Sequence, residues 1–314
     1  MRKPVVSAII PTYNRARDVR VAVASVVGQT YPVSSLEILV VDDGGSDDTE
    51  EVLAREFGDR IRYLRKPNGG VSAARNYGME HATGEFLALL DDDDEWRPSK
   101  VELQAEILEA RPEIGMVVTD TERMNEYRGG FEIFSRREQL PEDGWVLPHV
   151  LRNPSLAPSS VMMRREVFEA TGGFDSSLRT AEDLDFFLRA ALRFQVAVIS
   201  DPLTRAMRGH QGLSLLARTY HDYIEVIERF VRDHGHLIDP VDREAALFCA
   251  YIKNARGFLW QGNFGEAARL AGMAAARARS PAELREMGKL GVDMAKNAGV
   301  RAKRWVRARA GART

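Results

Sequence analysis

The chain has 314 residues, of which 44% are hydrophobic and 29% charged, and its formal net charge is −2. This composition indicates a globular protein of one large domain or two smaller ones. Because its charges nearly balance, the protein has no overall electrostatic field that would attract nucleic acid. A single cysteine, Cys249, excludes an intramolecular disulfide and favours a cytoplasmic location. No apolar run approaches the roughly 18 residues of a membrane-spanning helix, and VVSAII near the start is too short for a signal peptide.

The first ninety residues alternate apolar runs with helical patterns. The runs that predict strands are 5–10, 36–41, 61–66 and 85–91. The stretches between them that predict helices are 15–28, 49–57 and 71–82. Strands joined by helices are typical of a parallel α/β sheet, in which ligands bind at the carboxyl ends of the strands.

The rest of the chain changes character twice. Residues 113–165 are irregular and predict an antiparallel extension with loops, and 182–194 predict a helix. From about Leu213 onward the chain is almost entirely helical in pattern. We therefore expect an α/β domain at 1–212 and a helical region with a basic tail at 213–314.

The most informative feature is LLDDDDEW, in which Asp91 to Asp94 follow a predicted strand. Four adjacent carboxylates repel one another, and a divalent cation such as Mg²⁺ is the usual compensator. Because Mg²⁺ is held by one or two carboxylates plus substrate phosphates, this run indicates a diphosphate-bearing substrate. The alternative is an acidic turn that caps a helix beginning near Pro98.

Polar residues also follow the first two predicted strands. Tyr13, in the segment PTYNR, can stack a nucleobase, and the alternative is a half-buried packing residue. Asp42 and Asp43 can accept hydrogen bonds from a base or a ribose, and the alternative is ordinary Asp-Gly turn chemistry. Both segments therefore suit a nucleotide at this edge of the sheet.

Three later segments carry further candidates. In NGGVSAARN, Arg75 can face diphosphate oxygens, although a glycine-rich loop before an ordinary helix explains the same residues. Glu182 and Asp183 begin a predicted helix and suit a general base, or alternatively only a helix cap. His210 can bind a metal or a phosphate, and a lone histidine has no such role by default.

The ordered set of motifs resembles the family 2 glycosyltransferases of the GT-A fold. The motifs are SAIIPTYNR, VVDDGGSDDT, NGGVSAARN, LLDDDDEW, GGFD, AEDLDFFLR and RGHQGLS. They cover roughly residues 5–214 in the family's order. The resemblance implies a Rossmann-like, mostly parallel sheet, here with a C-terminal helical extension. One departure is Gly45, where the family usually has serine, and we expect it to loosen that loop.

The resemblance also assigns residues. It implies that the nucleotide-binding residues are Pro11, Thr12, Tyr13, Arg15, Asp43, Asn68, Arg75, Asp91 and Asp92. It implies Asp93 as the direct ligand of Mg²⁺ or Mn²⁺, with His210 at the metal and Arg208 at the diphosphate. Asp183 matches the family's catalytic base, with Glu182 beside it.

The implied reaction is transfer of a sugar, with inversion, from a nucleotide-sugar donor to a hydroxyl of a carbohydrate or lipid-linked acceptor. The nucleotide preference is weakly for uridine or deoxythymidine, and the implied setting is surface polysaccharide or glycolipid assembly. One alternative is an inactive scaffold that works through its helical C-terminus. A sugar nucleotidyltransferase is disfavoured, because PTYNR stands where such enzymes have a glycine-rich loop.

The C-terminal region suggests two kinds of contact. Residues 253–279 resemble a single tetratricopeptide-type hairpin, which can pack on the catalytic domain or form a homodimer contact. Residues 289–314 hold eight Lys and Arg against one acid, Asp293. An amphipathic basic helix there can touch anionic lipid at the inner face of the membrane, and the alternative is a solvated tail.

Overall fold

The computed structural model describes residues 3–124, 131–133, 140–206 and 217–311. The chain divides into two compact units, Met1–Gln211 and Gly212–Thr314. The division falls within the stretch that the structure does not describe, beside the boundary expected at Leu213. Each unit is described by itself below.

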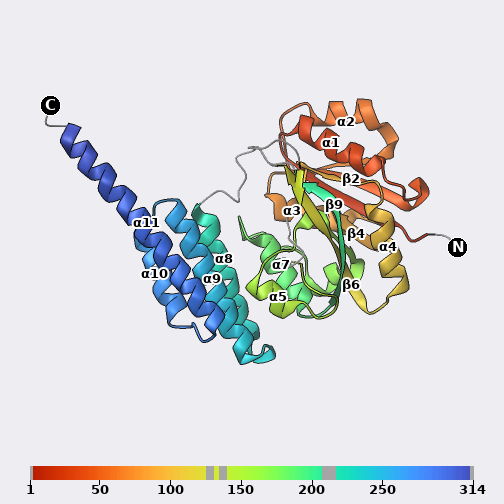
Figure 1. Cartoon of the computed structure of the whole chain (residues 1–314). Helices are drawn as coiled ribbons and strands as arrows, with labels where there is room; N and C mark the ends of the chain where they lie inside the picture. The colour runs from red at the N-terminus through yellow and green to blue at the C-terminus, as the bar shows by residue number, and fades with distance from the viewer. Residues whose placement is uncertain (1–2, 125–130, 134–139, 207–216, 312–314) are drawn as a thin grey trace. The chain divides into compact units, whose positions relative to one another are not determined.

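The first unit is built on one mixed sheet (Figure 1). Its described strands are β1 (Val6–Thr12), β2 (Leu36–Asp42), β3 (Arg62–Arg65), β4 (Phe86–Leu89), β5 (Asp94–Trp96), β6 (Ile114–Met124), β7 (Phe131–Ile133), β8 (Val161–Arg164) and β9 (Gln195–Ala206). Their order is β3-β2-β1-β4-β8-β6-β9-β5, with β7 paired to β6. The continuous apolar runs predicted as buried strands form β1, β2 and β4, whose neighbours cover both faces.

Helices cover both faces of this sheet. The described helices of the first unit are α1 (Ala16–Val27), α2 (Thr49–Phe57), α3 (Val71–His81), α4 (Lys100–Ala110), α5 (Leu147–Arg152), α6 (Arg165–Thr171) and α7 (Glu182–Ala191). One apolar core joins α1, α2 and α4 to alternate residues of β1, β2 and β4. On the opposite face, α3 lies so close that a Cβ on Gly78 would meet Ile9 Cγ2 at 2.4 Å. The position of α3 is therefore fixed by backbone-to-sheet packing.

The sheet is parallel only in part. The strands β3, β2, β1 and β4 are parallel, which agrees with the expectation from the first ninety residues. β8 then runs antiparallel to both β4 and β6, so the antiparallel extension predicted for 113–165 is confirmed. β6 and β9 pair in parallel again, so the sheet is mixed, and its parallel strands form the Rossmann-like part that the resemblance implied.

The acidic run is bounded by a strand that the sequence did not predict. β5 begins at Asp94 and pairs antiparallel with β9, placing Asp94 opposite Ala206. This pairing holds the C-terminal side of the acidic run against the sheet, while β4 holds its N-terminal side. The run is therefore a fixed turn between two strands.

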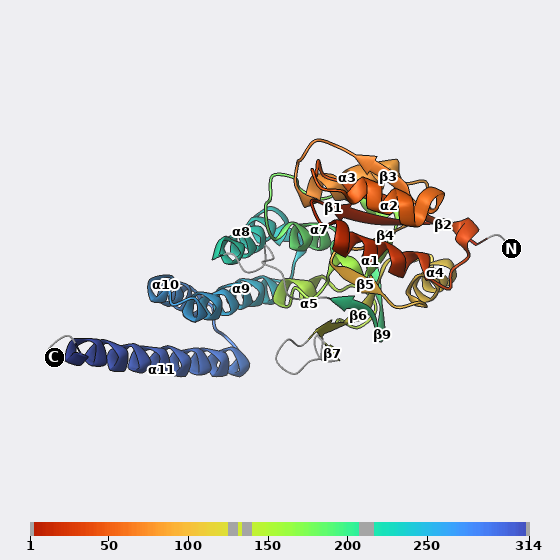
Figure 2. The same cartoon turned by 90° about the horizontal axis from the view of Figure 1, so that it is seen from above.

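The second unit consists of helices (Figure 2). They are α8 (Ala217–His234), α9 (Pro240–Trp260), α10 (Phe264–Ala275) and α11 (Pro281–Gly311). The side chains of Asp239 and Asn263 cap α9 and α10 by accepting from Val241 N and Glu266 N. α9 and α10 form the hairpin predicted for 253–279, and α11 continues past α10 in both views. Across the described residues, none of the helices has the length and apolar character needed to cross a membrane.

Candidate functional site

The acidic turn between β4 and β5 is held from beneath by the segment before β8. Asp91 N donates to Ser159 Oγ at 3.1 Å, and the buried Trp96 donates from Nε1 to Ser159 O at 2.8 Å. Asp94 N donates to Asp91 O at 3.1 Å and closes the turn. The turn therefore presents its carboxylates in a fixed geometry at the carboxyl end of β4.

Arg15 and Thr12, from the end of β1, contact the middle of this turn. Arg15 Nη1 lies 3.0 Å from both Asp92 Oδ1 and Asp93 Oδ2, and Thr12 Oγ1 donates to Asp92 Oδ2 at 2.9 Å. Burial raises the pKa of Asp92 to about 6 even though Arg15 opposes the shift. Burial and the charge of Asp91 also raise the pKa of Asp93. One guanidinium does not fully compensate these carboxylates.

Arg75 of α3 joins the acidic turn to the start of α7. Its Nη2 donates to Asp91 Oδ1 at 2.6 Å and its Nη1 to Glu182 Oε1 at 2.9 Å, while the residue is 3% exposed. Burial disfavours its charge, but Asp91 and Glu182 outweigh burial and raise the pKa of Arg75. This double ion pair brings three sequence-predicted residues from three elements into one cluster.

Asp183 lies beside this pair at the N-terminus of α7. Ala181, just before it, has φ 61°, a left-handed conformation that is strained for a non-glycine residue. Burial, followed by the charge of Glu182, raises the pKa of Asp183 to about 7. Among the described residues, its only hydrogen-bond donor is Leu184 N, at 2.7 Å. A carboxyl that exchanges its proton near neutral pH suits a general base.

The predicted nucleotide-binding residues of the β1 and β2 ends lie at the same edge of the sheet. Asp43 is buried and accepts from Lys66 Nζ at 2.6 Å and from Gly70 N at 2.7 Å. Asn68 Nδ2 donates to Asp43 O at 3.0 Å. Tyr13 is 49% exposed and so remains available for stacking, while Pro11 and Thr12 are buried within β1.

Gly45 does not loosen the β2 loop as expected. Its N–H donates to Asp42 Oδ1 at 2.7 Å, and its carbonyl accepts from Arg65 Nη2 at 2.6 Å. A Cβ there would meet Asp42 Oδ1 at 2.9 Å and Asn14 Oδ1 at 3.0 Å. Gly45 is thus closely packed and hydrogen-bonded on both sides, and the expectation of a looser loop is wrong.

The carboxylates of the acidic turn fit a hard cation. Over the part of the chain that the structure describes, no three His, Cys, Asp or Glu side chains converge as a complete metal-binding group. Burial nevertheless raises the pKa of Asp92 and of Asp93, and the nearby Arg15 offsets this only in part. Mg²⁺ and Mn²⁺ bind such oxygens and can take their remaining ligands from phosphates and water. The turn therefore suits a cation brought together with a diphosphate.

Two predicted residues lie outside the described part of the chain, and three contributors were missed. Arg208 and His210 follow Ala206, the last described residue of β9, which pairs with Asp94. Sequence reasoning overlooked three residues that hold parts of the site: Ser159 bonds the acidic turn, Lys66 bonds Asp43, and Asn76 bonds Phe174. Lys66 lies two residues before the NGG segment, and this position could have singled it out. Ser159 carries no local signal, because its role depends on contacts more than sixty positions away.

Relatives with curated descriptions point to one family. A protein described as an uncharacterized glycosyltransferase from Rickettsia felis is 32% identical over 228 residues, which cover 67% of this chain and 36% of that protein. A second from Rickettsia conorii is 35% identical over 226 residues, covering 67% of this chain and 35% of that protein. The chain thus spans about a third of the length of these two relatives.

Solved structures and a family model complete the comparison. The mannosyltransferase PcManGT from Pyrobaculum calidifontis, solved with GDP-Man and Mn²⁺, has a TM-score of 0.64 and 21% identity, covering 96% of this chain and 81% of that one. S. aureus TarS 1–349 with UDP-GlcNAc has a TM-score of 0.68 and 18% identity, covering 93% and 89%. At such identities the likeness concerns the fold, and it confirms the predicted GT-A fold. The model described as "Glycosyl transferase family 2" matches residues 7–172, more than half of the chain, and the protein therefore belongs to glycosyl transferase family 2.

Proposed function

We propose that this protein transfers a sugar from a nucleoside diphosphate sugar to an acceptor hydroxyl, with inversion at the anomeric carbon. The observation that carries the proposal is the double ion pair of Arg75. It joins Asp91 of the acidic turn to Glu182, whose neighbour Asp183 has a pKa raised to about 7. The Arg75 guanidinium thus links a donor-side carboxylate to the first turn of the helix that carries the candidate base.

The donor side of the proposal rests on the strand ends. The nucleobase of the donor lies against Tyr13 and Asp43, and its diphosphate lies at the acidic turn. Mg²⁺ or Mn²⁺ held by Asp93, with His210, would supply Lewis-acid stabilisation of the leaving diphosphate. Arg208 is assigned to the diphosphate. The solved neighbours with UDP-GlcNAc and with GDP-Man and Mn²⁺ support a donor of this class.

The chemical step is assigned to Asp183. It accepts the proton of the acceptor hydroxyl as the oxygen attacks the anomeric carbon. Glu182 is engaged by Arg75 and orients that guanidinium, so its role differs from that of its neighbour. Direct attack needs one base and no carboxylate nucleophile, in contrast to retaining glycosidases, which need two carboxyl groups. Inversion follows from that single displacement.

We propose a cytoplasmic enzyme that adds single sugars in surface polysaccharide or glycolipid assembly, and this setting rests on family analogy. The competing function is an inactive scaffold that acts through its helices. The acidic run and the Glu182-Asp183 pair are complete in the sequence, which favours the enzyme. A sugar nucleotidyltransferase lacks support, since Pro11-Thr12-Tyr13 stand at the end of β1 in place of a glycine-rich loop.

Thermal unfolding with a panel of nucleoside diphosphates, with and without Mn²⁺, tests the donor site. We expect one nucleotide to raise the melting temperature only when Mn²⁺ is present, because a ligand of the folded state adds about 2.7 kcal/mol at a hundredfold its Kd. Asp93→Asn should remove the metal-dependent part of the shift. The matched variant Asp59→Asn, at an acid in a turn remote from the acidic run in sequence, should retain it.

Two results would count against the donor site. A panel without any shift would favour the inactive scaffold. A full metal-dependent shift in Asp93→Asn would leave the nucleotide site in place and remove Asp93 from its assigned role.

We also propose that the C-terminal part of α11 binds anionic lipid. The backbone is helical to Gly311, and the sequence of 289–314 is strongly basic. The full chain should pellet with vesicles containing phosphatidylserine, and the chain lacking 289–314 should not. Binding should weaken at high salt, since the attraction is electrostatic. Equal partitioning of both chains would end the idea.

A further inference from the structure

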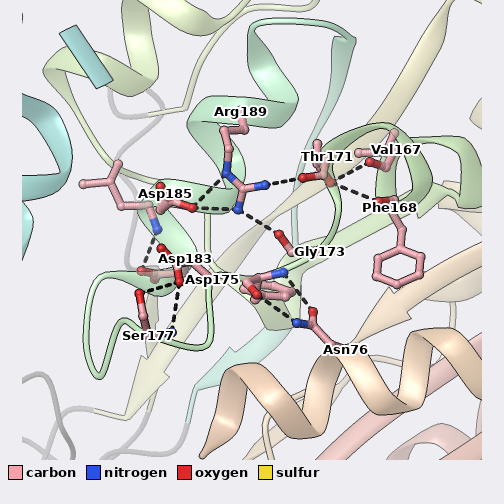
Figure 3. A network of polar contacts seen from close by, with 12 residues as sticks. Asn76, Val167, Phe168, Thr171, Gly173, Asp175, Ser177, Asp183, Asp185 and Arg189 are labelled. Atoms are coloured by element: carbon pink, nitrogen blue, oxygen red, sulfur yellow. Dashed lines mark hydrogen bonds and ion pairs between the residues drawn. The ribbon is translucent and has the colours of Figure 1, made fainter. Parts of the chain in front are cut away.

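The turn of Gly172, Gly173 and Phe174, between α6 and α7, is held by the side-chain amide of Asn76 from α3 (Figure 3). Asn76 Nδ2 donates to Phe174 O at 2.8 Å, and Phe174 N donates to Asn76 Oδ1 at 2.8 Å. Both hydrogen-bonding groups of one backbone residue are therefore satisfied by one side chain. Asn76 directly follows Arg75, so the residue that holds this turn is adjacent to the residue that pairs with Glu182.

Two glycines allow the turn to lie directly against the Asn76 amide. Gly172 and Gly173 have φ values of 75° and 78°, a conformation that favours glycine. A Cβ on Gly173 would meet Asn76 Oδ1 at 2.5 Å. The two glycines therefore allow the backbone to turn and to press directly against the amide.

The ring of Phe174 contacts both α7 and Arg75. Its ring stacks on Phe186 of α7, with ring centroids 4.4 Å apart and an interplanar angle of 18°. The guanidinium carbon of Arg75 lies 5.1 Å from the centroid of the same ring. The aromatic ring thus contacts the helix that carries Asp183 and also the cation of the double ion pair.

Arg189 ties α7 to the same turn from the other direction. Its Nη1 donates to Thr171 O at 2.6 Å and its Nη2 to Gly173 O at 2.8 Å. Asp185, one turn earlier on α7, holds the guanidinium through bonds of 2.8 and 2.6 Å. Figure 3 shows these contacts meeting above Asp183. Ala181 offers no side-chain cap to α7, and these bonds hold the body of the helix against the turn.

We propose that the turn of Gly172, Gly173 and Phe174, gripped by Asn76 and Arg189, sets the position of Asp183 relative to the donor site. Asn76 and Arg189 are positioning residues that act through the turn and α7. α3 itself is fixed by the close approach of Gly78 to β1, so loss of the grip displaces α7 and leaves α3 in place. This inference rests on the proposed function, in which Asp183 is the base.

Asn76→Ala is the test. We expect kcat to fall about 10- to 100-fold, as displacement of a catalytic group by about 1 Å can do. The Kd of UDP with Mn²⁺, or of the nucleotide that the panel selects, should change less than twofold. Turnover is followed as release of the nucleoside diphosphate with an acceptor, or with water in its place. The acid limb of the kcat/KM profile should move to lower pH, because a displaced Asp183 is better solvated.

A matched control separates positioning from stability. Arg165 Nη2 donates to Ala82 O at 2.8 Å and to Gly84 O at 2.7 Å, before the amino end of β4. Arg165→Met loses a similar fork of guanidinium–carbonyl bonds at the edge opposite the site. It should lower the melting temperature without moving the acid limb. Arg189→Lys keeps its charge for Asp185 but loses the fork, and it provides a milder variant if Asn76→Ala does not fold.

The outcomes are distinct. Unchanged kcat and an unmoved acid limb in Asn76→Ala and Arg189→Lys, with Asp183→Asn inactive, would overturn the positioning role and leave the proposed function standing. Full turnover in Asp183→Asn would instead remove the base on which both ideas depend. A tenfold loss in Asn76→Ala with the limb displaced would support the inference.

Discussion

Asp183→Asn is expected to lower kcat by about 10²- to 10⁴-fold, the usual contribution of a general base, with little change in donor affinity. The amide cannot accept the proton of the acceptor hydroxyl, whereas the donor contacts at Asp43 and the acidic turn remain. Steady-state kinetics combined with titration of the nucleotide would separate the two effects. Turnover within a few fold of the natural protein would exclude Asp183 as the base.

The pH dependence of the natural protein gives an independent check of Asp183. Because its pKa is raised to about 7, kcat/KM should fall as the pH drops below about 7 and the carboxyl becomes protonated. The raised pKa also means that the folded state binds this proton more tightly than the unfolded state. Stability is therefore lost as the pH rises from the unfolded value of about 4 through 7. Asp183→Asn avoids that loss, so at pH 8 it should unfold at no lower temperature.

Arg75→Met is expected to lower the free energy of unfolding by about 3 kcal/mol, because removal of one partner leaves buried charge uncompensated. Asp91 and Glu182 would then face each other without the guanidinium that lies 2.6 and 2.9 Å from their oxygens. Turnover should fall as well, since the start of α7 loses its link to the acidic turn. Urea unfolding at pH 8, with the midpoint and slope compared with those of the natural protein, measures the first effect.

The control for Arg75→Met is Arg20→Met. Arg20 lies 3.2 Å from Glu56, and the two side chains are 45% and 37% exposed. Pairs of this kind contribute about 0–1 kcal/mol, so the control should remain close to the natural protein. Equal losses in the two variants would show that the buried position of Arg75 confers no special dependence on its charge.

The fold was largely predictable because its first half follows local patterns. Continuous apolar runs predicted β1, β2 and β4, and polar residues directly after them predicted the site edge. β5 could not be predicted, since Asp94 to Trp96 carry no strand pattern and become a strand only by pairing with β9, more than a hundred residues later. The sequence predicted antiparallel pairing in 113–165 but not the order of the strands, because that order depends on contacts between distant segments.

The sequence predicted which residues gather at the candidate site better than it predicted how they contact one another. The motifs identified Asp91, Asp93, Asp183 and Arg75, but the sequence directed Arg75 at diphosphate oxygens. The structure pairs it with two carboxylates, Asp91 and Glu182, that lie 16 and 107 positions away. Asn76 was passed over beside Arg75, because an asparagine in a helix gives no sign of a partner such as Phe174. Such roles follow from tertiary contacts, which residue patterns do not encode.

Burial and the charge of Glu182 raise the pKa of Asp183, and the charge of Asp91 adds to them, so protonation of Asp183 and donor binding at the acidic turn are coupled. A cation held by Asp93 would add positive charge beside Asp91 and weaken the hold of Asp183 on its proton, so donor binding with the metal should release protons into the solution. By reciprocity, a proton on Asp183 opposes donor binding by the same free energy. The acid limb of kcat should therefore lie at lower pH than that of kcat/KM. Calorimetry in buffers of different ionisation enthalpy would count the protons released, and the loaded enzyme would hold its base ready at a pH where the empty enzyme does not.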